Sequence, residues 1–193
     1  MSTNIHAEQK PLIYQIGKHV KLVDDAIFCK SIIADGKELI TGEEYGAIRV
    51  LELKDEKVYI TFKEDLTSLA NAFSGCSALK SIPENLFANC PKATDFSFTF
   101  FGCKALTAIP EGLFANNPKV TIFQGTFSYC SALKSIPANL FANNRKVNSF
   151  RLTFSGCSAL KSIPENLFAN CPKVNSSFQT FALCKSLKSI PTG

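Results

Sequence analysis

The sequence predicts a repeat solenoid with short strands and short helical turns, preceded by a small β-rich cap. Three observations lead to this prediction. Residues from about 70 onward repeat with a constant period of 27, the charge balance changes near residue 66, and short β-rich runs fill the segment before that change. Periods of this length are typical of proteins in which equal units stack on one another. We therefore expect a cap or anchor over residues 1–66 and a solenoid of about 4.5 units over residues 67–193.

The first part, residues 1–66, contains runs that are typical of strands. Residues 49–54 and 57–63 are alternating runs on either side of two acidic residues, the pattern of a β-hairpin. Asp35-Gly36 supplies turn residues between other β-rich runs. These other runs cover residues 11–16, 20–23 and 26–33. We expect a small β-subdomain that covers the first repeat.

Each repeat carries a phenylalanine that is followed three residues later by a cysteine. The phenylalanines are Phe73, Phe100, Phe127, Phe154 and Phe181, and the cysteines are Cys76, Cys103, Cys130, Cys157 and Cys184. A Leu-x-x-Ile-Pro stretch follows, then Leu-Phe, and then a second half with a similar apolar spacing. One unit alone buries too little apolar surface to offset its conformational entropy, so neighbours must cover each other. The Phe and Cys residues are predicted to form a structural ladder in the core.

Each half of the unit could hold a short strand and a short helical turn. Both the Leu-x-x-Ile pair and the Val-x-x-Phe pair are candidates for the strand on the concave side. We favour Leu-x-x-Ile, because proline ends it sharply and cysteine precedes it.

The eight cysteines are predicted to be reduced structural thiols. Five recur at a spacing of 27 and no Cys-x-x-Cys occurs, so the spacing of a zinc finger is absent. Cys90 and Cys171 alternate with Asn117 and Asn144 at a second repeat position. Such an exchange suits a buried group that donates to a turn carbonyl. A disulfide or a metal site is the alternative.

We expect no enzymatic activity, no catalytic residue and no cofactor. His6 and His19 are the only histidines, and neither belongs to a recognisable nucleophilic motif. No glycine-rich phosphate loop occurs. Glu84, Glu111 and Glu165 share one repeat position, which predicts an outward row and not a pair across a cleft.

Two rows of lysines are the candidate ligand-binding residues. Residues 67–193 carry twelve basic and four acidic residues, against nine basic and twelve acidic in residues 1–66. The rows are Lys80, Lys134, Lys161 and Lys188, and Lys92, Lys119, Lys146 and Lys173. Such rows suit an anionic glycan or an acidic protein, although solubility alone would also explain them. Nucleic acid is not expected, because no aromatic residue recurs at an exposed position beside these lysines.

The segment Thr-Phe-Ser-Gly-Cys-Ser-Ala-Leu-Lys-Ser-Ile-Pro at residues 153–164 resembles the leucine-rich repeat of the BspA-like family. The resemblance covers about two-thirds of the chain and recurs five times. It implies a leucine-rich-repeat-like fold and adhesion to proteins or glycans on bacterial surfaces, with related repeats in phage proteins of the gut. The start lacks the layout of a secretory signal, and no stretch is long enough to span a membrane.

Two functions follow from this resemblance. The first is a non-enzymatic recognition or adhesion module on a bacterial surface or phage particle, which binds protein or glycan through a solenoid face. The second is a structural virion protein, a capsid- or tail-attached fibre or decoration with residues 1–66 as its anchor. An intracellular effector is a third possibility. The last repeat exposes Phe181, Leu187 and Ile190, which predicts self-association through that end.

Overall fold

A computed structural model describes residues 10–39 and 46–189. Seven strands and one short 3-10 helix are seen in these ranges. They are β1 (Leu12–Tyr14), β2 (Gly17–Val23), η1 (Ala26–Phe28), β3 (Cys29–Ala34), β4 (Lys37–Glu38), β5 (Ile48–Leu53), β6 (Lys57–Phe62) and β7 (Leu79–Ser81). The β-rich runs predicted at residues 11–16, 20–23, 49–54 and 57–63 are therefore confirmed as strands, whereas the run at 26–33 begins with η1 and is a strand only from Cys29 onward.

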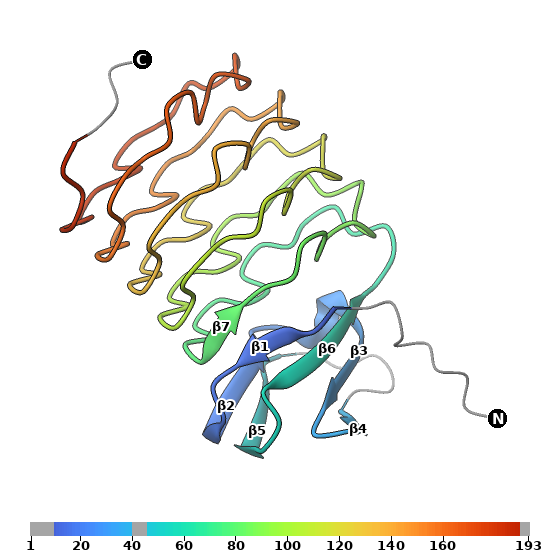
Figure 1. Ribbon diagram of the computed structural model, residues 1–193. Coiled ribbons are helices and arrows are strands. Elements are labelled where there is room, and N and C mark those ends of the chain that lie inside the picture. Colours follow the sequence, from blue (N-terminus) through green and yellow to red (C-terminus); the bar gives the residue numbers. More distant parts are fainter. Residues whose placement is uncertain (1–9, 40–45, 190–193) are drawn as a thin grey trace.

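The strands form two open antiparallel sheets. The larger has the order β4-β3-β6-β1-β7, and the smaller pairs β2 with β5. Strand β6 lies inside the larger sheet, and its alternate residues Val58, Ile60 and Phe62 are buried. Alternation with period two places these three side chains on one face, where they join the core. Figure 1 shows both sheets at one end of the molecule.

The predicted hairpin of residues 49–63 is wrong. Both runs are strands, but β5 pairs with β2 whereas β6 pairs with β1 and β3. The Asp35 carboxylate accepts hydrogen bonds from the backbone N–H groups of Lys54 and Asp55, which turns the chain from one sheet to the other. A tight turn does form at Asp35-Gly36, between β3 and β4. Both of its residues have positive φ, as a two-residue type I′ turn requires.

The predicted fold class, a leucine-rich-repeat-like solenoid with short strands and short helical turns, is wrong. The regular structure is antiparallel β-sheet, and the only helix of the described ranges is the three-residue η1 in the N-terminal part. Residues 67–189 contain one strand, β7, and no helix. Their chain is built from successive turns instead. Helical turns are absent there because left-handed residues recur within each repeat, and a positive φ interrupts a right-handed helix.

Consecutive repeats are nevertheless joined by backbone hydrogen bonds. We call each 27-residue repeat a coil and number its positions from 1, so that coils 1 to 5 begin at Thr67, Thr94, Thr121, Asn148 and Asn175. The N–H groups at positions 3, 5, 7 and 9 of each coil donate to the carbonyls at positions 2, 4, 6 and 8 of the next coil. In coil 3, for example, the Phe123 N–H bonds the Ser149 carbonyl at 3.0 Å and the Tyr129 N–H bonds the Ser155 carbonyl at 2.7 Å. Figure 1 shows the coils following one another from the sheets to residue 189.

These backbone hydrogen bonds form a ladder in the half of the repeat that contains the Val-x-x-Phe pair. We had favoured the other half, with the Leu-x-x-Ile pair, for the strand. The isolated parallel bridges join position 2 of successive coils, from Ser68 to Ser176, between the Val and Phe of the second apolar pair. The Leu-x-x-Ile half forms a strand in coil 1 alone, where β7 pairs with β1. Prolines after Ile82 and its equivalents deprive that half of one N–H donor per coil, which limits its pairing.

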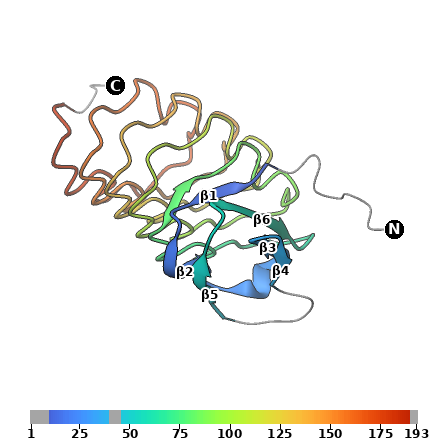
Figure 2. The ribbon, with the colours of Figure 1, turned by 60° about the horizontal axis from the view of Figure 1, so that its bottom comes forward.

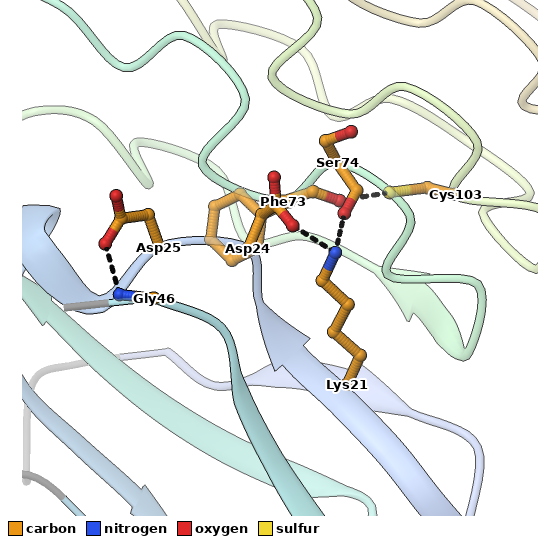
Figure 3. Close-up of polar contacts among 7 residues, drawn as sticks. All are labelled: Lys21, Asp24, Asp25, Gly46, Phe73, Ser74 and Cys103. Atoms are coloured by element: carbon orange, nitrogen blue, oxygen red, sulfur yellow. Dashed lines mark hydrogen bonds and ion pairs between the residues drawn. The ribbon is translucent and has the colours of Figure 1, made fainter.

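The N-terminal part completes the hydrogen bonds of coil 1. Carbonyls at positions 6 and 8 of later coils accept from a preceding coil, which coil 1 does not have. In coil 1 the Ala72 carbonyl accepts from the Asp24 N–H at 2.8 Å, and the Ser74 carbonyl accepts from Lys21 Nζ at 2.6 Å. Lys21 also pairs with the Asp24 carboxylate. Figure 3 shows Lys21 reaching from β2 to Ser74.

The two parts share one sheet and one core. Strand β7 belongs to coil 1, and β1 and β6 come from the N-terminal part; all three lie in the five-stranded sheet. Figure 2 shows β1 lying beside the first coil. Phe62 of β6 packs against Phe73 and Phe87 of coil 1. The domain boundary near residue 66 stays a prediction, and a structural element crosses it.

No helix in the described ranges is long and apolar enough to cross a membrane.

Candidate functional site

The first lysine row keeps one backbone position in successive coils. Lys134, Lys161 and Lys188 are exposed, and Lys80 is half-buried and lies 3.8 Å from the Glu56 carboxylate. The Lys161 N–H bonds the Lys134 carbonyl at 3.4 Å, and the Lys134 N–H bonds the carbonyl of Thr107, which interrupts the row in coil 2. Neighbouring ammonium groups thus project from backbone positions that lie side by side.

The second lysine row is also exposed in every coil where it occurs, at Lys92, Lys119, Lys146 and Lys173. Lys92 forms an ion pair with Asp65 at 2.5 Å, so part of its charge is neutralised by the N-terminal part. The other three have no ion-pair partner among the described residues. Both rows can attract a polyanion, because like charges held close together create a positive potential.

The predicted ladder residues lie in the core, in two kinds of column. The five phenylalanines stack nearly parallel, with successive ring centroids 5.3, 5.5, 5.6 and 5.5 Å apart. Four of them are fully buried, and Phe181 of coil 5 is half-buried. From coil 2 onward, each cysteine sulfur donates to the carbonyl of the ladder phenylalanine in the preceding coil. Cys130 Sγ, for instance, lies 3.2 Å from the Phe100 carbonyl oxygen.

All eight cysteines are free and buried. Burial raises the pKa of Cys76 and Cys130 to about 12 and that of Cys90 and Cys171 to about 11. A thiol with such a pKa stays protonated at neutral pH, and the thiolate is the nucleophile and the metal ligand. These thiols therefore serve as weak hydrogen-bond donors inside the core.

Position 24 of the coil, where cysteine and asparagine exchange, is a buried donor site. Asn117 Nδ2 donates to the carbonyls of Phe87 and Cys90 at 3.0 and 2.9 Å, and Asn144 makes the equivalent bonds one coil later. Cys171 points its sulfur at the same two carbonyl positions. The exchange predicted a donor to turn carbonyls, and these bonds confirm it.

Sequence reasoning missed a surface at positions 4, 5, 8 and 9 of coils 2 to 5, which we call the variable face. Its large apolar side chains and its one arginine are Phe98, Phe101, Tyr129, Arg151, Leu152, Phe178 and Leu183. Three of them are strongly exposed: Tyr129 at 46%, Phe178 at 56% and Leu183 at 60%. The signal was present in the sequence, because these side chains stand where other coils carry glycine or another small or polar residue.

The rings of the variable face touch one another from coil to coil. Phe98 meets Phe101 edge to face at 6.0 Å, and Phe101 meets Tyr129 of the next coil at 5.5 Å. The Arg151 guanidinium lies over the Phe178 ring, 5.1 Å from its centroid. Edge-to-face rings and a stacked guanidinium leave apolar faces available to a partner.

The remaining sequence candidates are dispersed. Glu84, Glu111 and Glu165 are all exposed, and Glu84 pairs with Lys10 at 3.8 Å. His19 is exposed on β2, and His6 lies outside the described residues. Across residues 10–39 and 46–189, no three His, Cys, Asp or Glu side chains gather in a group that could hold a metal ion.

No protein-family model matches the chain, and no curated protein matches it.

Proposed function

We propose that the protein is a recognition module without enzymatic activity that is displayed on a bacterial surface or a phage particle. It binds an anionic glycan or an acidic protein through the first lysine row of its coils. The observation that carries this proposal is the first lysine row. Lys134, Lys161 and Lys188 are exposed at one position of successive coils, and hydrogen bonds between the coils hold the backbone of Lys134 and Lys161 in place.

Two physical arguments support a polyanion as the ligand. The coils are closely stacked, so a chain of regularly spaced anionic groups can meet several lysines at once. Multiple weak contacts on one scaffold add up to a much higher affinity than each contact gives alone. The buried Phe columns make this scaffold rigid, so little entropy is lost when the ligand binds.

The test is the binding of hyaluronate and dextran sulfate to the immobilised full chain at several salt concentrations. We expect the Lys134→Glu/Lys161→Glu/Lys188→Glu variant to lose at least tenfold in affinity, and the remaining affinity to depend less on salt. The matched control is Lys119→Glu/Lys146→Glu/Lys173→Glu, which changes the net charge equally in the second row. Equal losses in both variants would mean attraction by net charge alone, and no loss in the first would remove this row as the site.

The proposed display is tested separately. Antibody against the chain should label the surface of intact cells or purified phage particles of the source. Labelling that appears only after lysis would contradict it.

A further inference from the structure

The coils differ from one another mainly on the variable face. From position 10 to position 27 the coils are nearly identical, with a recurrent Leu-Lys-Ser-Ile-Pro followed by Leu-Phe-Ala-Asn. At positions 4, 5, 8 and 9, coils 2 to 5 read Ser-Phe-Phe-Gly, Gln-Gly-Ser-Tyr, Arg-Leu-Ser-Gly and Phe-Gln-Ala-Leu. A face that served only the stacking of coils would repeat like the rest of the unit.

The backbone of this face is unfavourable for the side chains that it carries. Positions 5 and 9 have φ between 55° and 75° in all five coils. Glycine adopts this left-handed conformation most easily, and a bulky side chain is uncommon there. Phe98, Tyr129, Leu152 and Leu183 nevertheless occupy it, at 55°, 59°, 58° and 60°. Backbone strain of this kind is concentrated at ligand-binding sites, so these residues point to binding.

The rings are accommodated by glycines of the next coil. A Cβ on Gly125 would lie 2.3 Å from Phe98 Cε1, and a Cβ on Gly156 would lie 2.7 Å from Tyr129 Cδ1. Each ring therefore rests on the bare backbone of the following coil. Large residues and glycines complement each other at these two places, and apolar side chains line this strip of the surface in each of coils 2 to 5.

Charge is scarce on this strip. Positions 2 to 9 of coils 2 to 5 include one acid, Asp95, and one base, Arg151, although the repeats as a whole are strongly basic. Aromatic residues and arginine with few other charges are the composition of the central part of a protein–protein interface. An anionic glycan or a nucleic acid would instead favour the lysine rows.

The spacing of the coils selects the shape of the partner. Successive ring centroids are 5.3 to 5.6 Å apart in the column of Phe73, 5.9 Å in that of Phe96 and 6.1 to 6.2 Å in that of Phe87. The hydrogen-bonded backbone at positions 2 to 9 is spaced at ~4.8 Å, so the spacing of the coils ranges from ~4.8 to about 6 Å across the stack. An α-helix advances about 5.4 Å per turn, so a helix along the stack can place one side-chain layer on each coil. An extended peptide repeats its side chains on one face every ~6.7 Å, which is longer than any of these spacings.

We propose that the variable face docks an amphipathic α-helix of a partner protein, which lies along the coil stack with its apolar side toward Phe98, Tyr129 and Phe178. The distance from coil 2 to coil 5 corresponds to roughly three helical turns. An acidic side chain of the helix pairs with Arg151, whose guanidinium is held over Phe178. This face carries no lysine, so the helix-docking proposal does not depend on the proposal that the lysine row binds a polyanion.

The experiment is a selection of phage-displayed peptide libraries, one of helical and one of extended scaffolds, on the immobilised full chain. We expect enrichment of helical peptides with apolar residues three and four positions apart and at least one acid. Their affinity should fall at least tenfold for Phe98→Ser/Tyr129→Gly/Phe178→Ser and should be unchanged for Lys119→Ser/Lys146→Ser/Lys173→Ser. Arg151→Glu should weaken the selected peptide, and replacing the peptide's acid with lysine should restore binding to that variant.

Several results would overturn the proposal. Enriched peptides from the extended library alone, or peptides that bind the ring-deficient variant equally well, would contradict a helix on this face. Absence of enrichment from both libraries would do the same. Binding of cellohexaose or oligo-dT that is lost with the three rings would assign the strip to a neutral glycan or to single-stranded nucleic acid. Circular dichroism melting of each variant excludes loss of fold as the cause.

Discussion

The residues at positions 5 and 9 have a left-handed backbone in every coil, and they determine where side chains stand on the variable face. The N–H groups at positions 6 and 10 bond the carbonyls three residues earlier, so the left-handed residue is the third residue of each turn. That is the geometry of a type II turn, in which glycine or asparagine is preferred. A side chain at this place costs about 1–2 kcal/mol and points away from the core.

Replacement of Gly125 by alanine tests the fit between ring and glycine. Gly125 and Gly102 both have positive φ, but a Cβ at Gly102 meets nothing closer than 3.8 Å. We expect Gly102→Ala to lower the free energy of unfolding by about 1 kcal/mol, and Gly125→Ala to lower it by at least about 1 kcal/mol more. Chemical denaturation measures both. In a Phe98→Ala background the excess should disappear, and its persistence would show that the ring does not rest on Gly125.

Asn117 should tolerate cysteine far better than aspartate. Its Nδ2 faces two carbonyl oxygens in the core, and its Oδ1 has no partner among the described residues. Asn117→Asp places a buried carboxylate against those carbonyls, so we expect a loss of about 3 kcal/mol or more at pH 7. Protonation turns the carboxyl into a donor, so the loss should shrink as the pH falls toward 4. Asn117→Cys should cost about 1 kcal/mol and show no such pH dependence; similar losses in both variants would contradict the donor role.

The columns of buried Phe and Cys residues that hold the coils together could be predicted from the sequence. Constant spacing places each Phe above the next, and an apolar residue that recurs without insertion can only be explained by a shared core. The buried Cys and Asn donors followed from their exchange at one position. Helical turns were predicted wrongly, because Phe-x-x-Cys is compatible with a helix and with a run of turns, and the left-handed residues that decide between them vary in type.

The Phe column gives an element-scale prediction. Phe127 is fully buried and stacks on Phe100 and Phe154. Phe127→Ala should lower the free energy of unfolding by about 3–5 kcal/mol, because it removes a buried ring and leaves a cavity. Phe178→Ala is the matched control on the exposed face, and it should cost less than about 1 kcal/mol. Equal melting temperatures for wild type and Phe127→Ala would remove this residue from the core.

The cysteine column makes stability depend on pH in the alkaline range. Burial raises the pKa of Cys130 to about 12, whereas a thiol in the unfolded chain ionises near pH 8.5. Below about pH 8 the thiol is neutral in both states, so stability is constant. As the pH rises from about 9 toward 12, only the unfolded state loses the proton, and each thiol lowers stability by up to about 1.4 kcal/mol per pH unit. Urea midpoints from pH 7 to 11 measure this slope.

A Cys103→Ala/Cys130→Ala variant is the control for that slope. It should show a shallower decline than the wild type because two ionising groups are gone. Native thiols should also fail to react with a disulfide reagent at pH 8 until the protein is unfolded. Rapid reaction of the native protein would contradict the burial of these groups.

At the scale of the whole molecule, the described residues 10–39 and 46–66 share one sheet and one core with the repeats. The sheet takes a strand from coil 1, and Lys21 and Asp24 supply donors that a preceding coil would otherwise provide. The change in composition near residue 66 predicted a boundary there, and the five-stranded sheet extends across it. The composition could not predict the contact between the N-terminal part and coil 1. Nothing in the sequence distinguishes Lys21 from the other lysines, and only the fold brings it to residue 74.

Replacement of Lys21 tests this contact. Lys21→Met keeps most of the aliphatic stem but leaves the Ser74 carbonyl and the Asp24 carboxylate without their donor. We expect a loss of about 2–3 kcal/mol and faster amide exchange in coil 1, with little change in coils 4 and 5. Lys18→Met on the same strand is the control, because Lys18 is exposed. Identical exchange in coil 1 of both variants would show that Lys21 does not complete the ladder.

The hydrogen bonds from positions 3, 5, 7 and 9 all run from one coil to the next, and this polarity restricts how that edge of the protein can join others. Coil 5 ends this ladder of hydrogen bonds. Its N–H groups at residues 177, 179, 181 and 183 have no acceptor in the described part of the chain. The same edge of a second copy also presents N–H donors, so the two edges cannot form backbone hydrogen bonds with each other. The complementary edge lies in coil 1, where Lys21 and Asp24 already occupy two of its carbonyls. Contact between the coil 5 edges of two copies would therefore use side chains such as Phe181 and Leu187, and the N-terminal part covers some of the coil 1 edge that a head-to-tail contact would need.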